Sequence, residues 1–283
     1  MTTLKRLSTL PAAGARVRFP FGELTQEGGR LTLRVSDDAY VRALEHYAPT
    51  SAERGATLPA RLDAQGTATF GGDADGSVAA LELLSAPGMD PGTRLALVAD
   101  AMHALLAARG DSEPHLVAPA LLRYSTSRGE FQLLGLPLPQ ATLAEWFRSD
   151  ESAWTWCSRE VLLGKHNARP AQSYAAALQH LLLGSLLPSP LPRVERFERV
   201  LHARIARRSA FQRTLAAAAP SALAGEVGDL TQLLEELCRG ASAATIGRLE
   251  RALASFRADA LSRTLEASGH GARARELRVA LAR

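Results

Sequence analysis

The sequence is short of several residue types, and each shortage excludes a class of protein. Its 283 residues include only two cysteines, Cys157 and Cys238, which form neither a disulfide framework nor a CxxC metal motif. Reduced thiols of this kind are usual in cytosolic proteins. No apolar run reaches the roughly 20 residues of a membrane span, and the N-terminal segment has no apolar core long enough for a signal peptide. We therefore expect a cytoplasmic protein that does not use a membrane.

Aromatic residues are also scarce, at 5% of the chain, whereas alanine, leucine and arginine dominate and favour helix over sheet. A hydrophobic content of 46% with 22% charged residues is ordinary for a folded globular protein. The net charge of +4 is unevenly distributed. Residues 1–189 include 17 basic and 19 acidic residues, and residues 190–283 include 16 basic and 10 acidic residues. The basic last third permits an anionic partner but does not require one.

The first 88 residues have the pattern of strands and turns, with alternating apolar residues between glycine-rich breaks. One helix is predicted over Ser36–Glu45, where Asp37 and Asp38 suit its positive N-terminal end. The predicted strands cover residues 16–21, 31–35, 58–62, 67–70 and 78–84, with a hairpin turn over 71–76.

From residue 90 the pattern becomes helical, beginning with Asp90 as a cap and Pro91 in the first turn. Asp229 and Gln232 have the spacing of a capping box at the start of a later helix. Strands first and helices second predict an α+β fold in two parts, a β-rich region over 1–88 and a mainly helical region over 89–283. Two strands are also predicted within the second part, at 120–124 and 130–134, and helices at 91–110, 143–147, 174–187 and beyond 192.

The same segments resemble a protein kinase, in the order that the family has. Leu95–Gly110 resembles the long helix before the kinase catalytic loop, and Leu181–Pro188 resembles the end of the large buried helix. The resemblance implies a two-lobed, protein-kinase-like fold with a small β-rich N-terminal lobe and a larger, mainly helical C-terminal lobe. The other similar segments are Asp75–Gly88 (the strand into the hinge), Pro119–Leu122 (the catalytic loop), Phe131–Pro137 (the strand into Asp-Phe-Gly) and Ser158–Leu162 (Ala-Pro-Glu).

The residues that kinase chemistry requires are missing from these segments. A protein kinase needs a strand lysine, a catalytic aspartate, an asparagine and a second aspartate that holds Mg²⁺. By the resemblance, Leu116 stands at the catalytic aspartate, Leu121 at the asparagine and Gly135 at the metal-binding aspartate. Arg34 keeps the charge of the strand lysine, but a planar guanidinium does not reproduce a compact ammonium.

Counting residues leads to the same expectation without an alignment. The two lysines are Lys5, before the first predicted strand, and Lys165, after the Ala-Pro-Glu-like segment. The only asparagine, Asn167, also follows that segment. Mg²⁺ prefers oxygen ligands, which these positions do not offer. We therefore expect no kinase catalysis, no binding of Mg-ATP, no metal or other cofactor, and no enzymatic activity, while an apolar ligand stays open.

Two further groups of residues suggest chemistry. Asp100 and His103 share a helix face and are followed by Asp111 and His115, which together suggest an acid–base or metal site. No nucleophile or HExxH-like spacing accompanies them, so a solvated face and a polar loop are the favoured interpretation.

Cys157 and His166 suggest a reactive pair, although the tryptophans beside the cysteine favour packing. By the kinase resemblance, Glu160 would pair with an arginine of a late helix, for which Arg248 is a loose candidate.

The most basic segment, residues 193–213, contains seven arginines. At 100° per residue, five of them fall within a sector of about 120°. They are Arg193, Arg196, Arg204, Arg207 and Arg208. A phosphate-binding stripe has this pattern, but apolar residues interrupt the sector and no aromatic series suggests base stacking. A solvated face is favoured, and nucleic acid stays open as a partner.

The leading hypothesis is a catalytically inactive, pseudokinase-like protein that binds a protein partner as an interaction, scaffold or regulatory module. The alternative is a nucleic-acid-associated accessory protein that uses the Arg-rich last third. A third hypothesis is an enzyme of unrelated type around Asp100, His103 and His115.

Overall fold

The computed structural model describes most of the chain, in ranges separated by gaps. The described residues are 16–27, 30–52, 57–58, 60–70, 77–86, 88–107, 118–134, 136, 145–146, 148, 151–157, 170–187, 193–205, 213–215, 217–219, 223–239, 242–273 and 276.

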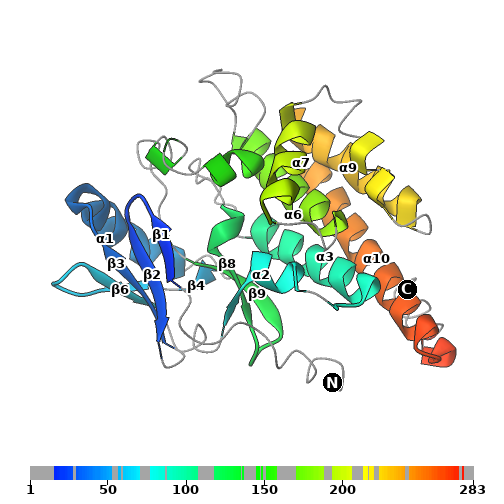
Figure 1. Cartoon of the computed structure of the whole chain (residues 1–283), viewed down its shortest axis with the longest axis horizontal. Coiled ribbons are helices and arrows are strands. Elements are labelled where there is room, and N and C mark those ends of the chain that lie inside the picture. Colours follow the sequence, from blue (N-terminus) through cyan, green and yellow to red (C-terminus); the bar gives the residue numbers. More distant parts are fainter. Residues whose placement is uncertain are drawn as a thin grey trace. The chain divides into compact units, whose positions relative to one another are not determined.

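These residues group into two compact units. The first takes most of its described residues from 16–83 and 120–148, and the second from 84–106 and 152–273. The first unit contains the β-sheets and the second is mainly helical (Figure 1). The predicted α+β class is therefore confirmed. The hairpin over 122–134 belongs to the first unit although it follows residue 88 in the chain.

A five-stranded antiparallel sheet dominates the first unit, with the order β1-β2-β3-β6-β5. Helix α1 (Asp38–Ala52) lies between β3 and β5 in the chain and contacts both strands. Its N-terminus is stabilised by the Asp37 carboxylate, which accepts a hydrogen bond of 2.8 Å from the amide of Ala39. The strands are β1 (Arg16–Phe19), β2 (Gly22–Glu27), β3 (Arg30–Val35), β5 (Ala60–Leu62) and β6 (Thr67–Phe70).

The two faces of this sheet have opposite character, as alternation along each strand requires. Leu31 and Leu33 of β3 are buried on one face, and Tyr40 and Leu44 of α1 are buried as well. On the other face, cross-strand neighbours are polar, for example the hydroxyls of Thr25 and Thr32, 2.9 Å apart. Burial of the apolar face is therefore what fixes the register of the strands.

Strand β2 was not predicted, because Leu24 is its only strongly apolar residue. Its first residue must be small: a Cβ on Gly22 would overlap the carbonyl oxygen of Arg34 on the adjacent strand. Gly22 therefore begins the strand that the sequence pattern assigned to a break.

The strand predicted over 78–84 is wrong beyond its first two residues. The structure has β7 at Val78–Ala79 and then the short helix α2 at Ala80–Leu84. Ala80, Leu83 and Leu84 are buried, which is the i, i+3, i+4 spacing of one helix face. Short apolar runs do not distinguish strand from helix by periodicity alone.

A second, four-stranded sheet completes the first unit, with the order β4-β9-β8-β7. Its hairpin consists of β8 (Leu122–Ser125) and β9 (Glu130–Leu134), close to the strands predicted there, and β4 is Thr57–Leu58. Arg123 of β8 is only 5% exposed and links the two sheets. Its guanidinium donates to the side chain of Gln26 and to the carbonyl of Ser77, each at 2.8 Å.

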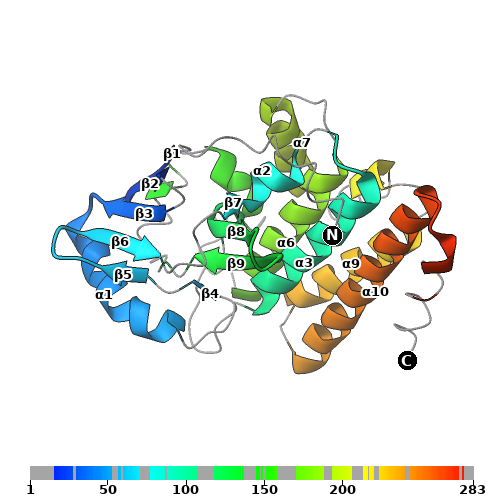
Figure 2. The same cartoon turned by 90° about the horizontal axis from the view of Figure 1, so that it is seen from below.

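Helices form the second unit. α6 packs against α9, and α9 packs against α10, so that the three lie side by side (Figure 2). The leucine-rich run of α6 is buried throughout, as the sequence pattern predicted for 174–187. The main helices are α3 (Pro91–Ala107), α6 (Pro170–Leu186), α7 (Arg193–Ile205), α9 (Ala224–Arg239) and α10 (Ala243–Ala267). Within the described ranges, no helix of 18 or more residues has the apolar stretch that crossing a membrane requires.

The start of α3 is the predicted cap. The Asp90 carboxylate accepts hydrogen bonds from the amide of Thr93 at 2.8 Å and from the hydroxyl of Thr264 on α10 at 2.7 Å. Gly92 lets the two helices approach, because its Cβ would overlap the Thr264 hydroxyl and lie 2.7 Å from the carbonyl oxygen of Ala260.

The predicted capping box at Asp229 is wrong, since α9 begins at Ala224 and Asp229 lies inside it. Val227 is buried one turn before Leu230, so the buried face of the helix starts earlier than its leucines. Packing of Val227 extends the helix through Gly225 and Gly228, two residues of poor helix propensity.

Candidate functional site

Of the three positions that would be catalytic in a kinase, the structure describes one. Leu121 is 1% exposed at the end of the 3₁₀ turn η3 (Pro119–Leu121), where its side chain is part of the core. Leu116 and Gly135 lie outside the described residues, as do the turn over 71–76, Lys165 and Asn167. The only acidic residue between 118 and 134 is Glu130, which is exposed. This stretch therefore offers no buried carboxylate for a metal ion.

The third strand has no inward-facing cation. Leu31 and Leu33 occupy its buried face, and Arg34 is exposed on the polar face, opposite Glu23 of β2. An arginine in this orientation does not replace an ammonium held on the buried face of the sheet.

The arginine stripe predicted on α7 is not a continuous exposed surface. Arg204 is only 8% exposed, and its guanidinium donates to the side chain of Gln179 and, at 2.9 Å, to the carbonyl of Cys157. Arg196 is half-buried. The side chain of Arg193 and the whole of Arg207 and Arg208 lie outside the described residues. Arg204 faces inward because α7 packs against α6, and it is therefore not an exposed phosphate ligand.

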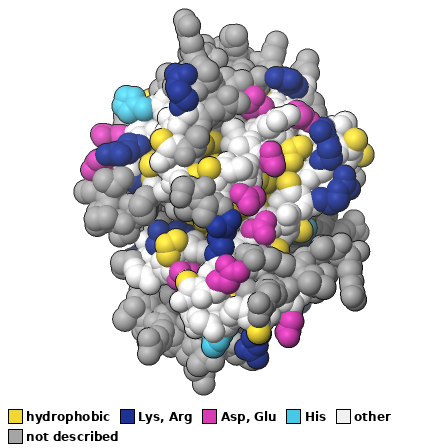
Figure 3. Space-filling model, turned by 90° about the vertical axis from the view of Figure 1, so that its right-hand side faces the viewer, with side chains coloured by type: hydrophobic (Ala, Val, Ile, Leu, Met, Phe, Trp, Pro, Cys, Tyr) yellow, Lys and Arg dark blue, Asp and Glu magenta, His cyan; other side chains and the backbone are white. Residues whose placement is uncertain are grey.

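Acidic and basic side chains are interspersed on the face shown in Figure 3. Among the described residues visible there, opposite charges lie near one another, which limits the attraction for a polyanion.

Arg204 belongs to a buried polar cluster around His180 of α6. His180 is 4% exposed, and burial lowers its pKa to about 4, with the charges of Arg204 and Arg196 acting in the same direction. Its Nδ1 atom is buried without a hydrogen-bond partner among the described residues. The imidazole is therefore neutral at physiological pH, and its protonation is unfavourable.

Cys157 lies next to this cluster and is not an activated nucleophile. Its thiol is buried and donates to the carbonyl of Trp154 at 3.1 Å. Burial raises the pKa of the Cys157 thiol to about 12, although Arg204 opposes the change. Its suggested partner, His166, lies outside the described residues. The packing interpretation of Cys157 agrees with this environment.

The suggested acid–base group is not assembled among the described residues. Asp100 forms an ion pair with Arg257 of α10, with 2.6 Å between Oδ1 and Nε, and His103 is exposed. Asp111 and His115 lie outside the described residues. Within the described ranges, no three or more His, Cys, Asp or Glu side chains are grouped so that they could hold a metal ion. Asp100 therefore acts as a salt-bridge partner between two helices.

Arg248 has a partner other than the one suggested for it. It donates to the carboxylate of Glu236, which joins α10 to α9. Glu160 lies outside the described residues, so its pairing stays a prediction.

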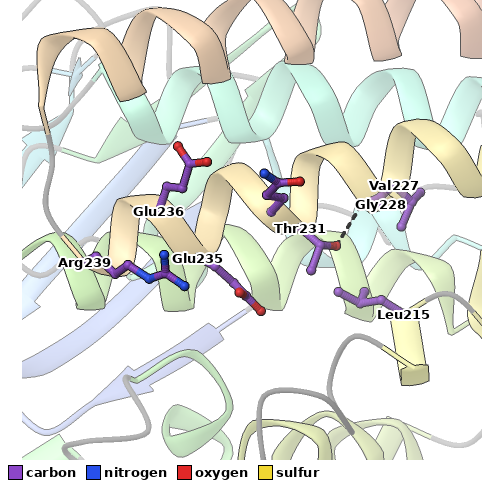
Figure 4. A pocket seen from close by; sticks show the side chains of 8 residues that line it. Leu215, Val227, Gly228, Thr231, Glu235, Glu236 and Arg239 are labelled. Carbon is purple, nitrogen blue, oxygen red and sulfur yellow. Dashed lines mark hydrogen bonds between the residues drawn. The ribbon is translucent and has the colours of Figure 1, made fainter.

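A hollow of about 490 Å³ lies beside α9. Leu215, from a short helical segment before α9, lies opposite the helix, on the side to which Thr231 and Glu235 point (Figure 4). The other described lining residues come from α9, and they are Val227, Gly228, Gln232, Glu236 and Arg239. The hollow thus follows one face of α9 over three turns.

The chemistry of this hollow differs from one end to the other. Leu215 and Val227 make one end apolar, and Gly228 leaves that end without a side chain. A glycine inside an exposed helix costs about 1 kcal/mol relative to alanine. No atom lies within 4 Å of a Cβ built on Gly228, so close packing is not what requires it.

The other end is acidic. Glu235 is only 8% exposed although it lines the hollow, whereas the side chain of Glu236 points to the other side of α9 (Figure 4), where it pairs with Arg248. Arg239 is the one basic residue among the eight lining residues. Sequence reasoning missed the site because the capping-box prediction started the helix at Asp229, which removed Val227 and Gly228 from its face. A glycine at an exposed helical position was the signal that could have indicated it.

Comparison with models of known protein families and with curated protein sequences gives no match to this chain.

Proposed function

We propose that the chain is a catalytically inactive, protein-kinase-like domain that acts as an interaction or scaffold module. The observation that carries the proposal is the order of elements in the first unit. A five-stranded antiparallel sheet, β1-β2-β3-β6-β5, has one helix inserted after its third strand in the chain. This arrangement is similar to the small lobe of protein kinases.

The elements that follow support the same reading. The long helix α3 precedes the 3₁₀ turn at Pro119–Leu121 and the hairpin β8–β9, as the long helix precedes the catalytic loop in the family. The buried, leucine-rich helix α6 and the later helices α7, α9 and α10 correspond to a mainly helical large lobe.

Phosphoryl transfer requires groups that these elements lack. In protein kinases a lysine on the third strand holds the nucleotide phosphates, and an asparagine and an aspartate hold Mg²⁺. Here Leu31 and Leu33 are the buried residues of the third strand, and Leu121 stands at the asparagine position. Shifting the alignment by a residue or two along β3 does not supply the lysine, because neither of the two lysines of the chain lies in this strand.

A kinase-like domain that lacks its catalytic groups is suited to binding a partner protein. This inference rests on the argument from missing chemistry together with the open hollow beside α9, which has polar and apolar walls suited to a peptide segment. The nucleic-acid alternative is weaker, because Arg204 is turned inward.

Thermal unfolding with ATP or ADP, with and without Mg²⁺, tests the proposal. A ligand that binds only the folded state stabilises it by RT ln(1 + [L]/Kd) and so raises the unfolding temperature as its concentration increases. We expect no magnesium-dependent rise and no transfer of labelled phosphate to the chain itself or to a generic acceptor protein. A magnesium-dependent rise or transfer above that of a heat-denatured control would overturn the inactive reading.

A further inference from the structure

We propose that the polar face of the five-stranded sheet binds the phosphate backbone of a double-stranded nucleic acid, through arginines and threonines of β3, β6 and β5. This surface is separate from the arginine-rich last third of the chain. The inference goes beyond the proposed function and does not depend on it.

The residues that face outward on these three strands form one continuous surface. Leu33 of β3 and Ala68 of β6 are buried, so alternation places the residues beside them on the opposite face of the sheet. The register aligns Thr32 with Thr69 and Thr69 with Arg61, from one strand to the next. The six outward residues are Arg30, Thr32, Arg34, Thr67, Thr69 and Arg61.

Three of these outward residues are arginines, and none is a carboxylate. Arg30, Arg34 and Arg61 are exposed, and no ion pair joins any of them to another described residue. The nearest carboxylate in the chain is that of Asp63, in the turn between β5 and β6. It accepts hydrogen bonds from the amides of Gln65 and Thr67, at 2.9 and 2.8 Å. The carboxylate of Asp63 is therefore engaged by its own turn.

The whole face of the sheet is also basic. Glu23 of β2 forms an ion pair with Arg18 of β1, 3.8 Å between the charged atoms. Glu27 is opposite Arg30 in the register, but no ion pair joins the two in the described structure. Five arginines face three carboxylates when Asp63 is included, a surplus of two positive charges. The arginines are Arg16, Arg18, Arg30, Arg34 and Arg61, and the carboxylates are Glu23, Glu27 and Asp63.

Guanidinium and hydroxyl groups are the side-chain donors that contact phosphates in nucleic-acid complexes. The hydroxyls of Thr25 and Thr32 are hydrogen-bonded to each other at 2.9 Å, which leaves one of their two hydrogens free to donate. Arg30 and Arg34 are four positions apart on β3, or about 13 Å, and Arg61 lies two strands from β3, or about 10 Å. Such spacing suits several phosphates of a backbone better than one small anion.

The composition of the face favours a duplex over other anionic partners. None of the outward residues is apolar, whereas binding to an anionic lipid surface depends on apolar area as well as charge. The centres of protein interfaces are likewise enriched in aromatic side chains. Single strands bind to aromatic platforms on which their bases stack, and this face has none. A duplex presents its phosphates without requiring stacking.

Two triple variants of the full chain test the site against net charge alone. Each removes three exposed arginines, and surface substitutions of this kind change stability little. The sheet variant combines Arg30→Gln, Arg34→Gln and Arg61→Gln. The control variant combines Arg213→Gln, Arg251→Gln and Arg273→Gln, all in the helical unit.

The measurement is the anisotropy of a labelled DNA duplex of about 20 base pairs, titrated with protein at several salt concentrations. Three phosphate contacts predict a slope of log affinity against log salt of about −2.7, so that a change from 50 to 200 mM weakens binding about 40-fold. We expect the sheet variant to weaken binding about tenfold or more at 50 mM salt and to flatten the slope, and the control variant to weaken it less than about threefold. Glu27→Gln should strengthen binding, and a second duplex of unrelated sequence should bind equally.

Several results would overturn the proposal. They are the absence of duplex binding at low salt, binding that added salt does not weaken, and equal weakening by the two triple variants. Tighter binding of a single strand than of its duplex would also contradict it. Binding of polyglutamate or of phosphatidylserine vesicles that is lost in the sheet variant, without duplex binding, would assign the face to another partner. None of these measurements involves ATP or Mg²⁺, so they leave the inactive-kinase proposal untouched.

Discussion

The buried imidazole of His180 makes the free energy of unfolding depend on pH, and replacing this one residue removes its contribution. Burial lowers its pKa from an ordinary 6.5 to about 4, and Arg204 and Arg196 add to the effect. A folded-state pKa below the unfolded one means that the unfolded chain binds the proton in an interval in which the folded chain does not. Stability therefore falls as the pH falls through 6.5, and the loss is complete below about 4.

The size of the effect follows from the two pKa values. Their difference corresponds to roughly 3 kcal/mol, of which about 2 kcal/mol is lost between pH 7 and pH 5. His180 is fully buried, so solvent screening reduces this figure little. Other groups also titrate in this interval, and only the difference between the protein and a His180 variant reports on His180.

The measurement is the free energy of unfolding in urea near pH 7 and near pH 5, for the unchanged protein, His180→Gln and His202→Gln. His202 is an exposed histidine of α7 and serves as the control. We expect the loss of stability on acidification to shrink by about 2 kcal/mol in His180→Gln and to be unchanged in His202→Gln. Equal pH dependence in all three proteins would refute the buried, neutral imidazole.

Three further substitutions or reactions test the packing of each unit. Gly92→Ala should destabilise the protein by about 2 kcal/mol because a methyl group there overlaps α10. The control, Gly247→Ala, should be neutral or stabilising. Urea unfolding of both variants measures the difference. Arg123→Ala should cost about 2–4 kcal/mol through the cavity and the loss of its hydrogen bonds to the Gln26 amide oxygen and the Ser77 carbonyl, of which the carbonyl keeps Gln26 as a donor, and Arg123→Lys should not restore the loss. A thiol reagent at mildly alkaline pH should modify the partly exposed Cys238 first and reach Cys157 only on unfolding, as peptide mass mapping would show; equal rates at both would contradict the buried thiol.

Local sequence patterns were enough to predict those elements whose ends or burial depend on residues close together in the chain. Asp90 with Pro91 predicted the start of α3, since a cap acts within one turn of the chain. The leucine-rich run predicted α6, because a helix that is buried on all sides has no polar face to obscure it. The absence of lysine from β3 was also visible in advance, since the sequence has only two lysines, Lys5 and Lys165.

Elements defined by their neighbours could not be predicted in the same way. β2 exists because β1 and β3 pair with it on both sides, although only Leu24 marks it in the sequence. Val78–Leu84 is apolar except for Glu82, and only the spacing of its buried residues distinguishes the helix α2 from a strand.

The sequence by itself determined the α+β class, the order of the main elements and the scarcity of lysine and asparagine, because each depends on residue type or short-range spacing. Only the tertiary structure decided whether a given side chain points into the core or towards the solvent, because neighbouring residues of the same type can face either way. Arg204 lies in an arginine-rich helix, yet it points inward because α7 packs on α6. Gly228 and Glu235 line a hollow because Leu215 lies opposite α9, and a contact between two separate helical segments leaves no pattern in either segment.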